Sequence, residues 1–120
     1  MIQIRFDIDQ DGEIVGFIAN NHGDKVICAA VSVLVINAIN SIEWLAGSDF
    51  SCEHENEGYI EFRLIDEADM NARLLLESLR LGIRSIAEEH PNEVTVEEIS
   101  VSVEWKEYLN DKNEFTVFRS

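Results

Sequence analysis

The chain has 120 residues, of which 46% are apolar, and this length suits one domain with one sizeable core. Six Gly and one Pro exclude a linker, a collagen-like repeat or a low-complexity protein. Nine basic residues against 24 acidic ones leave a formal net charge of -15. Such a surface repels nucleic acids and anionic membranes and attracts basic partners. We therefore expect one domain over residues 1–120 that binds neither nucleic acid nor membrane.

Two cysteines, Cys28 and Cys52, are too few for the disulfide framework of a small secreted domain. No basic and then apolar leader opens the sequence, so we expect both thiols to be reduced and the protein to be cytoplasmic. The longest apolar stretch, residues 26–36, is shorter than the roughly 20 apolar residues that a membrane span needs. It is expected to be a buried helix instead.

The first half of the chain reads as a hairpin, a helix and a second hairpin. Apolar residues alternate with polar ones before and after the turn signal at residues 9–12, which is typical of two half-buried strands. A long segment that is apolar on nearly every side then predicts a helix covered on more than one face. The predicted elements are strands over 2–8 and 14–19, a helix over 28–45, and strands over 50–52 and 59–64.

The second half adds a helix and further strands. Asp66 is the expected N-cap of a helix that carries its apolar residues at helical spacing and ends at Pro91. Strand residues follow over 94–105, and a short run over 115–118 indicates one more strand beyond a turn at 110–113. The order ββαββαβ predicts the α+β class: a mainly antiparallel sheet with two helices packed on it, plus a C-terminal extension.

Cys28 lies where a polar loop meets the start of the long apolar helix. The N–H groups at a helix N-terminus favour a thiolate, and the loop offers His22 as a base and Lys25 as a positive charge. A cysteine with a nearby histidine is the minimum set for nucleophilic thiolate catalysis. The alternative is a small buried side chain among apolar neighbours, and the spacing alone favours that alternative.

No glycine-rich phosphate loop and no metal-binding motif occurs in the sequence, so we expect no cofactor and no metal. The three histidines are scattered along the chain. A metal site formed by Cys52, His54 and nearby acids is the weakest alternative, because consecutive residues of a strand point to opposite faces.

Two segments resemble the ribosomal-processing cysteine protease (Prp) family. Residues 23–32, GDKVICAAVS, are similar to the family's active-site segment G-x-D-I-V-C-A-A-x-S. Residues 74–83, LLLESLRLGI, and 85–91, SIAEEHP, resemble its C-terminal helix and the ending of that helix. The resemblance extends over roughly residues 1–103 and leaves residues 104–120 as an extension outside it.

The resemblance implies a small bacterial α+β protein, usually a dimer, that removes an N-terminal extension from a basic protein of the large ribosomal subunit. Its Cys–His dyad would consist of Cys28 as the nucleophile and His22 as the general base. Ser32 takes the position of a family serine, where a packing or helix-capping role is the alternative. Amides of the helix N-terminus at Ala29 and Ala30 are expected to hold the oxyanion.

The sequence departs from the family pattern around the proposed dyad. His22 is followed by Gly23 where the family has G-H-A, and Lys25 replaces an aspartate. Cys28 follows His22 by six positions, about half the usual separation. We therefore keep two functions open: a Prp-like cysteine endopeptidase, and a non-catalytic homologue that binds a basic protein as a dimer. A protease with a different substrate is a third possibility.

The long apolar helix offers more apolar surface than one sheet can cover, which predicts contact with a second subunit. The alternative is burial of this helix beneath the C-terminal tail. Trp44 and Trp105 are both expected to lie in the core. The tail residues available for such burial are Trp105, Tyr108, Leu109 and Phe115.

Overall fold

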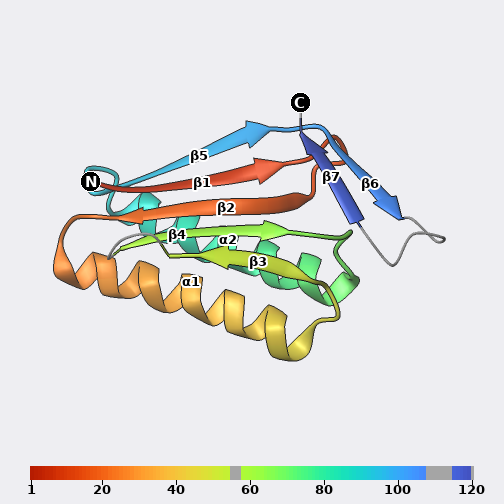
Figure 1. Cartoon of the computed structure of the whole chain (residues 1–120). Coiled ribbons are helices and arrows are strands. Elements are labelled where there is room, and N and C mark those ends of the chain that lie inside the picture. The colour runs from red at the N-terminus through yellow and green to blue at the C-terminus, as the bar shows by residue number, and fades with distance from the viewer. Residues whose placement is uncertain (55–57, 108–114, 120) are drawn as a thin grey trace.

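The computed structural model describes residues 1–54, 58–107 and 115–119 (Figure 1). Both helices lie on the same face of the main sheet. The α+β class and the ββαββαβ order are confirmed, with a two-stranded C-terminal addition. The elements are β1 (Ile2–Ile8), β2 (Ile14–Asn21), α1 (Lys25–Leu45), β3 (Phe50–Glu53), β4 (Tyr59–Leu64), α2 (Met70–Glu89), β5 (Val94–Ser100), β6 (Val103–Glu107) and β7 (Phe115–Arg119).

The main sheet has the strand order β3-β4-β2-β1-β5. β1 with β2, β2 with β4, and β3 with β4 are antiparallel pairs, as expected for strands joined by short connections. β5 pairs with β1 in parallel, with Ile2 opposite Val94, because α2 carries the chain back across the sheet before β5 begins. The sheet is thus mainly antiparallel, as the sequence predicts.

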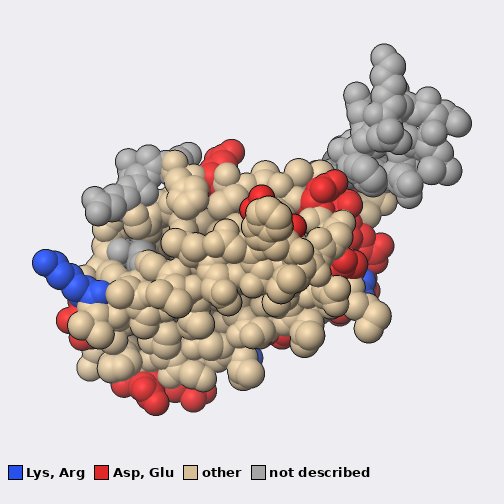
Figure 2. All heavy atoms as spheres, turned by 90° about the horizontal axis from the view of Figure 1, so that it is seen from below, with Lys and Arg blue, Asp and Glu red and all other residues tan. Residues whose placement is uncertain are grey.

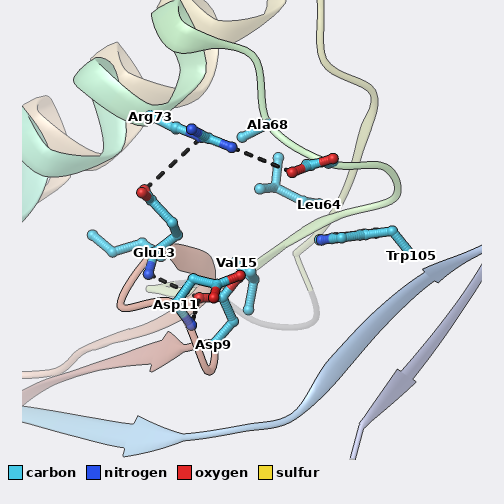
Figure 3. A pocket seen from close by; sticks show the side chains of 10 residues that line it. Asp9, Asp11, Glu13, Val15, Leu64, Ala68, Arg73 and Trp105 are labelled. Carbon is cyan, nitrogen blue, oxygen red and sulfur yellow. Dashed lines mark hydrogen bonds and ion pairs between the residues drawn. The ribbon is translucent and has the colours of Figure 1, made fainter.

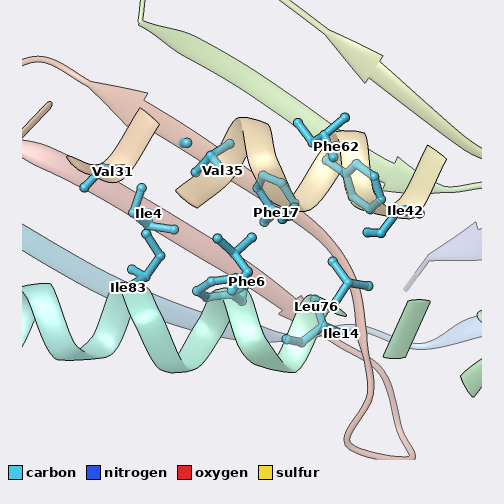
Figure 4. Packing of buried hydrophobic residues seen from close by; sticks show 14 of the residues in the cluster. Ile4, Phe6, Ile14, Phe17, Val31, Val35, Ile42, Phe62, Leu76 and Ile83 are labelled. Carbon is cyan, nitrogen blue, oxygen red and sulfur yellow. The ribbon is translucent and has the colours of Figure 1, made fainter. Parts of the chain in front are cut away.

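Aromatic rings form the centre of the core between the sheet and the helices (Figure 4). Strand alternation points Phe6, Phe17 and Phe62 toward the helices, in register on β1, β2 and β4. The Phe62 ring stacks on Phe17 at 5.0 Å and on Phe50 at 4.9 Å between centroids. The helices complete this core with Val31, Val35 and Ile42 from α1 and Leu76 and Ile83 from α2.

Helix α1 begins at Lys25, three residues before the predicted start. The reason is a cap that lies further upstream: the Asp24 carboxylate accepts hydrogen bonds from the N–H groups of Val26 at 3.0 Å and Ile27 at 3.2 Å. By length and composition alone α1 is long and apolar enough to cross a membrane. In this fold one side of it is buried against the sheet and α2, whereas the outer side is exposed, with Val33 at 67%. The predicted cover on more than one face is therefore not provided within the described residues of this chain.

The cap of α2 is Asp69, so the prediction of Asp66 is wrong. The Asp69 carboxylate accepts N–H bonds from Ala72 and Gly47, both at 2.7 Å, and these bonds lower its pKa. Asp66 instead accepts the Asp49 N–H at 3.1 Å, while desolvation raises its pKa. Both aspartates therefore join the loop after α1 to the loop before α2, a long-range role that helix spacing does not reveal.

The predicted strand over 94–105 is two strands, since β5 ends at Ser100 and β6 begins at Val103. Just after this break, Gln10 binds the first residue of β6: its side-chain amide donates to the Val103 carbonyl at 2.9 Å and accepts the Val103 N–H at 3.1 Å. β6 pairs with β7, which confirms the predicted last strand. The predicted turn at 110–113 lies outside the described residues.

The two tryptophans differ in environment. Trp105 packs against the core, as predicted, but Trp44 is 79% exposed near the end of α1, because it lies outside the helix stripe that faces the sheet. Val33 on the outer face of α1 is 67% exposed. The alternative that the C-terminal tail covers α1 stays a prediction. Tyr108 and Leu109 lie outside the described residues, and of Phe115 only the backbone in β7 is described.

We predict that the stacked rings around Phe62 contribute strongly to the stability of the fold. Replacing Phe62 with alanine removes the ring shared by Phe17 and Phe50 and leaves a cavity, so we expect a loss of about 3–5 kcal/mol in the free energy of unfolding. Urea unfolding followed by circular dichroism measures it. The control Glu88→Ala, on the exposed side of α2, is expected to change stability by less than about 0.5 kcal/mol. Equal effects would contradict the central place of Phe62.

Candidate active site

The predicted dyad residues, His22 and Cys28, both lie at one end of the main sheet. β2 runs toward this end and β4 starts from it, with Asn20 paired to Tyr59. Only residues 22–24 connect β2 to α1, so His22 and the first turn of α1 both lie here. The fold thus brings the segment of His22 and that of Cys28 to the same edge, and the pairing of their side chains stays a prediction.

Cys28 is the fourth residue of α1, and its N–H donates to the Asp24 carbonyl at 2.8 Å, the first full turn of the helix. Its side chain is half-buried and packs against the core. The thiol therefore lies at the boundary between the core and the surface. That place suits a nucleophile that a substrate must reach while it stays positioned by packing.

The charges around the start of α1 oppose one another. The positive end of the helix dipole and the exposed Lys25 lie at the turn that carries Cys28. The Asp24 carboxylate adds a negative charge at the same turn and already occupies the N–H groups of Val26 and Ile27. Lys25 is itself the first helical residue, whereas the sequence analysis placed it in the loop before the helix. The family's aspartate is thus replaced in sequence but an acid still caps this helix.

The other predicted site residues lie around Cys28 on the helix. Ala29 and Ala30 are exposed and follow it in the ladder of i to i-4 backbone bonds, whose donors are occupied within an α-helix. Their role at the oxyanion stays a prediction. Ser32 is half-buried one turn after Cys28, on the same side of α1. His22 is exposed in the loop before the helix.

A hollow of about 160 Å³ opens beside Ser32 and contains a residue that the sequence analysis did not place at this site. His54, just after β3, lines the hollow together with Gly58 and side chains of α1 and β4. The sequence did contain the signal, since alternation along β3 places Cys52 and His54 on the helix-facing side and Glu53 on the other.

Cys52 and His54 approach each other, with 3.9 Å between Sγ and Nε2. Burial raises the pKa of the Cys52 thiol, and the neighbouring Glu53 carboxylate raises it further. Within residues 1–54, 58–107 and 115–119 no group of three or more histidine, cysteine and acidic side chains is arranged to hold a metal. Because its pKa is raised, Cys52 is mostly a neutral thiol at neutral pH.

A second hollow, of about 220 Å³, lies at the opposite end of β1 and β2, by their connecting turn (Figure 3). Trp105 and several acids line it. Its acids are engaged locally: Asp9 accepts the N–H groups of Asp11 and Glu13, both at 2.9 Å, and Arg73 lies 4.0 Å from Glu13. It is remote from Cys28 along the strands and is not part of the candidate active site.

The comparisons with known proteins agree on one family. The profile described as Cysteine protease Prp matches residues 1–95. The chain belongs to the Prp family of cysteine proteases. A protein named ribosomal processing cysteine protease Prp from Staphylococcus aureus is 23% identical over 97 residues, covering 75% of this chain and 92% of the relative. The protein of the same name from Bacillus subtilis is 30% identical over 80 residues, covering 62% of this chain and 71% of the relative.

Solved structures share the Prp fold. The S. aureus Prp protease with a covalently linked product peptide matches with a TM-score of 0.77 at 20% identity, over 82% of this chain and 99% of that one. A Streptococcus mutans protein matches with a TM-score of 0.71 at 27% identity, over 83% and 98%. The family match contains the whole candidate site at residues 22–60, whereas β6 and β7 lie beyond it.

The contrast between the two thiols is testable. Because the pKa of Cys52 is raised, its thiolate fraction below pH 8 is small, and each unit of pKa difference changes that fraction by about tenfold. We expect iodoacetamide to alkylate Cys28 several times faster than Cys52 at pH 7, with the gap narrowing as the pH rises. Intact mass and peptide mapping measure both rates. In the control Glu53→Gln, alkylation of Cys52 is expected to become faster while that of Cys28 stays the same. Equal alkylation rates of the two thiols in the parent chain would contradict the prediction.

Proposed function

We propose that this chain is a cysteine endopeptidase that removes an N-terminal extension from a basic protein of the large ribosomal subunit. The observation that carries the proposal is Cys28 in the first turn of α1, within the segment that matches the Prp active-site pattern. The relatives named above are ribosomal processing cysteine proteases, and they lend the reaction class to the proposal.

In the proposed reaction the Cys28 thiolate attacks the scissile carbonyl and forms a tetrahedral intermediate. His22 then donates its proton to the leaving amine as the peptide bond breaks, and the acyl group remains on sulfur as a thioester. A water molecule, deprotonated by His22, hydrolyses the thioester and restores the thiol. No cofactor or metal takes part in these steps.

The net charge of -15 supports a basic substrate, which an acidic surface attracts and steers. The same charge argues against binding to nucleic acids and anionic membranes. Cys28 and Cys52 are not joined in a disulfide, which is in keeping with a reducing cytoplasm. We therefore place the protein in the cytoplasm, next to newly made ribosomal proteins.

Substitution of the dyad tests the proposal. The substrate is a peptide spanning the N-terminal extension of the organism's own basic ribosomal protein. Cys28→Ala is expected to abolish cleavage, and His22→Ala to lower kcat by about 10²–10⁴-fold, as for the loss of a general acid–base group. Mass spectrometry of the products measures both, and circular dichroism verifies folding. The matched control Cys52→Ala is expected to keep activity, and full activity of Cys28→Ala would refute the proposal.

A second candidate function is a homologue that binds the basic protein without cutting it. It is favoured by the acid at the start of α1, since the Asp24 carboxylate counteracts the helix dipole at Cys28. The six-residue separation from His22 to Cys28 points the same way. Under this function the wild-type chain and intact substrate form a stable complex, whereas the protease releases two products.

We also propose that the chain is a homodimer that pairs through its helical face. α1 and α2 lie side by side and antiparallel, with the Asn71 side chain donating to the Leu45 carbonyl at one end. Figure 2 shows this face largely free of charged side chains over its middle. A second copy would bury the exposed apolar side chains there: Val33 at 67%, Trp44 at 79%, Leu45 at 67%, Met70 at 83%, Leu74 at 69% and Leu81 at 70% exposure.

A charge placed on this face tests the dimer. Leu81→Asp puts a carboxylate among apolar side chains that the second copy would bury. We therefore expect the dissociation constant of the dimer to rise by at least about 100-fold. Sedimentation equilibrium at several concentrations measures the change. The control Thr95→Asp adds the same charge on the opposite, open side of the sheet and is expected to leave the dimer intact. A parent chain that is monomeric at every concentration would overturn the proposal.

A further inference from the structure

Strand β6 lies beyond the family match, yet its start is bound firmly to the domain. The Gln10 side chain forms hydrogen bonds with both the N–H and the carbonyl of Val103, which is buried. Just before β6, the Val101 N–H donates to the Ile8 carbonyl at 2.8 Å. Trp105 packs against the core. These contacts hold the start of β6 next to the turn between β1 and β2.

Trp105 forms one wall of the hollow of about 220 Å³ at this turn, the Trp105 hollow (Figure 3). Arg73 reaches the hollow from α2, and the acids of the turn line the side near β1 and β2. An engineered cavity of about 150 Å³ holds benzene, so the Trp105 hollow has room for the end of one long side chain. Its apolar lining consists of Ile14, Val15, Leu64 and Ala68.

Carboxylates outnumber the single guanidinium group in the Trp105 hollow. Arg73 pairs loosely with two of them: its Nε lies 4.0 Å from Glu13 and has no hydrogen-bond acceptor among the described residues, and its terminal nitrogen lies 3.4 Å from Glu67. The exposed Asp11 carboxylate has no hydrogen bond or ion pair within residues 1–54, 58–107 and 115–119. The hollow is therefore negative. Its acids are Asp9, Asp11, Glu13 and Glu67.

This combination of groups suits a cationic side chain. The face of an indole ring attracts a cation, and carboxylates accept its N–H groups in strong hydrogen bonds. The apolar lining suits the aliphatic stem of lysine or arginine. An aromatic wall and an open volume distinguish the Trp105 hollow from acidic side chains elsewhere on the surface of this chain.

From this geometry we propose that the Trp105 hollow is a docking site that holds a lysine or arginine side chain of the basic substrate protein, remote from the cut. β2 begins at the hollow and ends at Asn21, so about 20 Å separate the hollow from the end of the sheet that carries Cys28. An extended segment needs about six residues or more to cover this distance. The inference rests on the proposed function, because the docked protein is the one that Cys28 attacks.

Two substrates of different length test the docking site: the intact basic ribosomal protein, and a peptide of about eight residues centred on the cut, which is too short to reach the hollow. Asp11→Lys places a positive charge at the hollow and is expected to raise KM for the intact protein by about three- to tenfold. Its kcat/KM for the short peptide is expected to stay unchanged. Trp105→Ala is expected to act in the same direction, and Trp105→Phe, which keeps an aromatic ring, to lose less.

Glu88→Lys is the matched control, because it makes the same change of charge on an exposed position of α2 outside the hollow. It is expected to leave KM for the intact protein within about twofold of the parent value. Circular dichroism verifies the folding of each variant. An unchanged KM in Asp11→Lys, or an equal loss on both substrates, would overturn the inference while leaving the protease intact.

If the parent chain cleaves neither substrate, the proposed function fails, and the docking site is tested by binding. The intact basic protein is then titrated into Cys28→Ala, with and without Asp11→Lys, by isothermal titration calorimetry. Weaker binding in the double variant supports the docking site, and equal binding overturns it.

Discussion

The packing of α1 beneath the sheet is the contact on which the rest of this structure depends. Val31 and Val35 of α1 lie in the same core as Phe17 of β2, so the helix is fixed under the strand that precedes it. With only three residues between β2 and α1, this packing also fixes the position of Cys28. The candidate nucleophile is thus positioned by core packing, with little dependence on the connecting loop.

Three sides of α1 have different surroundings. Its inner stripe fills the core, Ser32 and Ile36 on its flank line the hollow next to His54, and its outer side presents Val33 and Trp44 to solvent. Burial in the core accounts for the apolar residues of the inner stripe, and the proposed dimer contact would account for those on the outer side. This explains why the segment is apolar on nearly every side, although one sheet covers only one of them.

The start of α1 near Cys28 carries an acid although the sequence there departs from the family pattern. Lys25 replaces the family's acid, but Asp24 caps the helix and brings a carboxylate to the same turn. The chain thus changes the position of the acid and the length of the loop while it keeps the helix start. At the other end of α1, Asp69 joins two loops by accepting the Gly47 N–H, which fixes the helix pair at its far end.

The sequence by itself determined the order of the elements, the hairpin pairs and the position of Cys28 at the start of a helix, because alternation, helical spacing and turn residues are local signals. It also pointed to the Prp family. Only the tertiary structure decided that Asp69 and not Asp66 caps α2, that Gln10 binds the start of β6, and that Trp44 is exposed. It also placed His54 beside Ser32. Each of these depends on contacts between residues far apart in the chain, which local patterns do not encode.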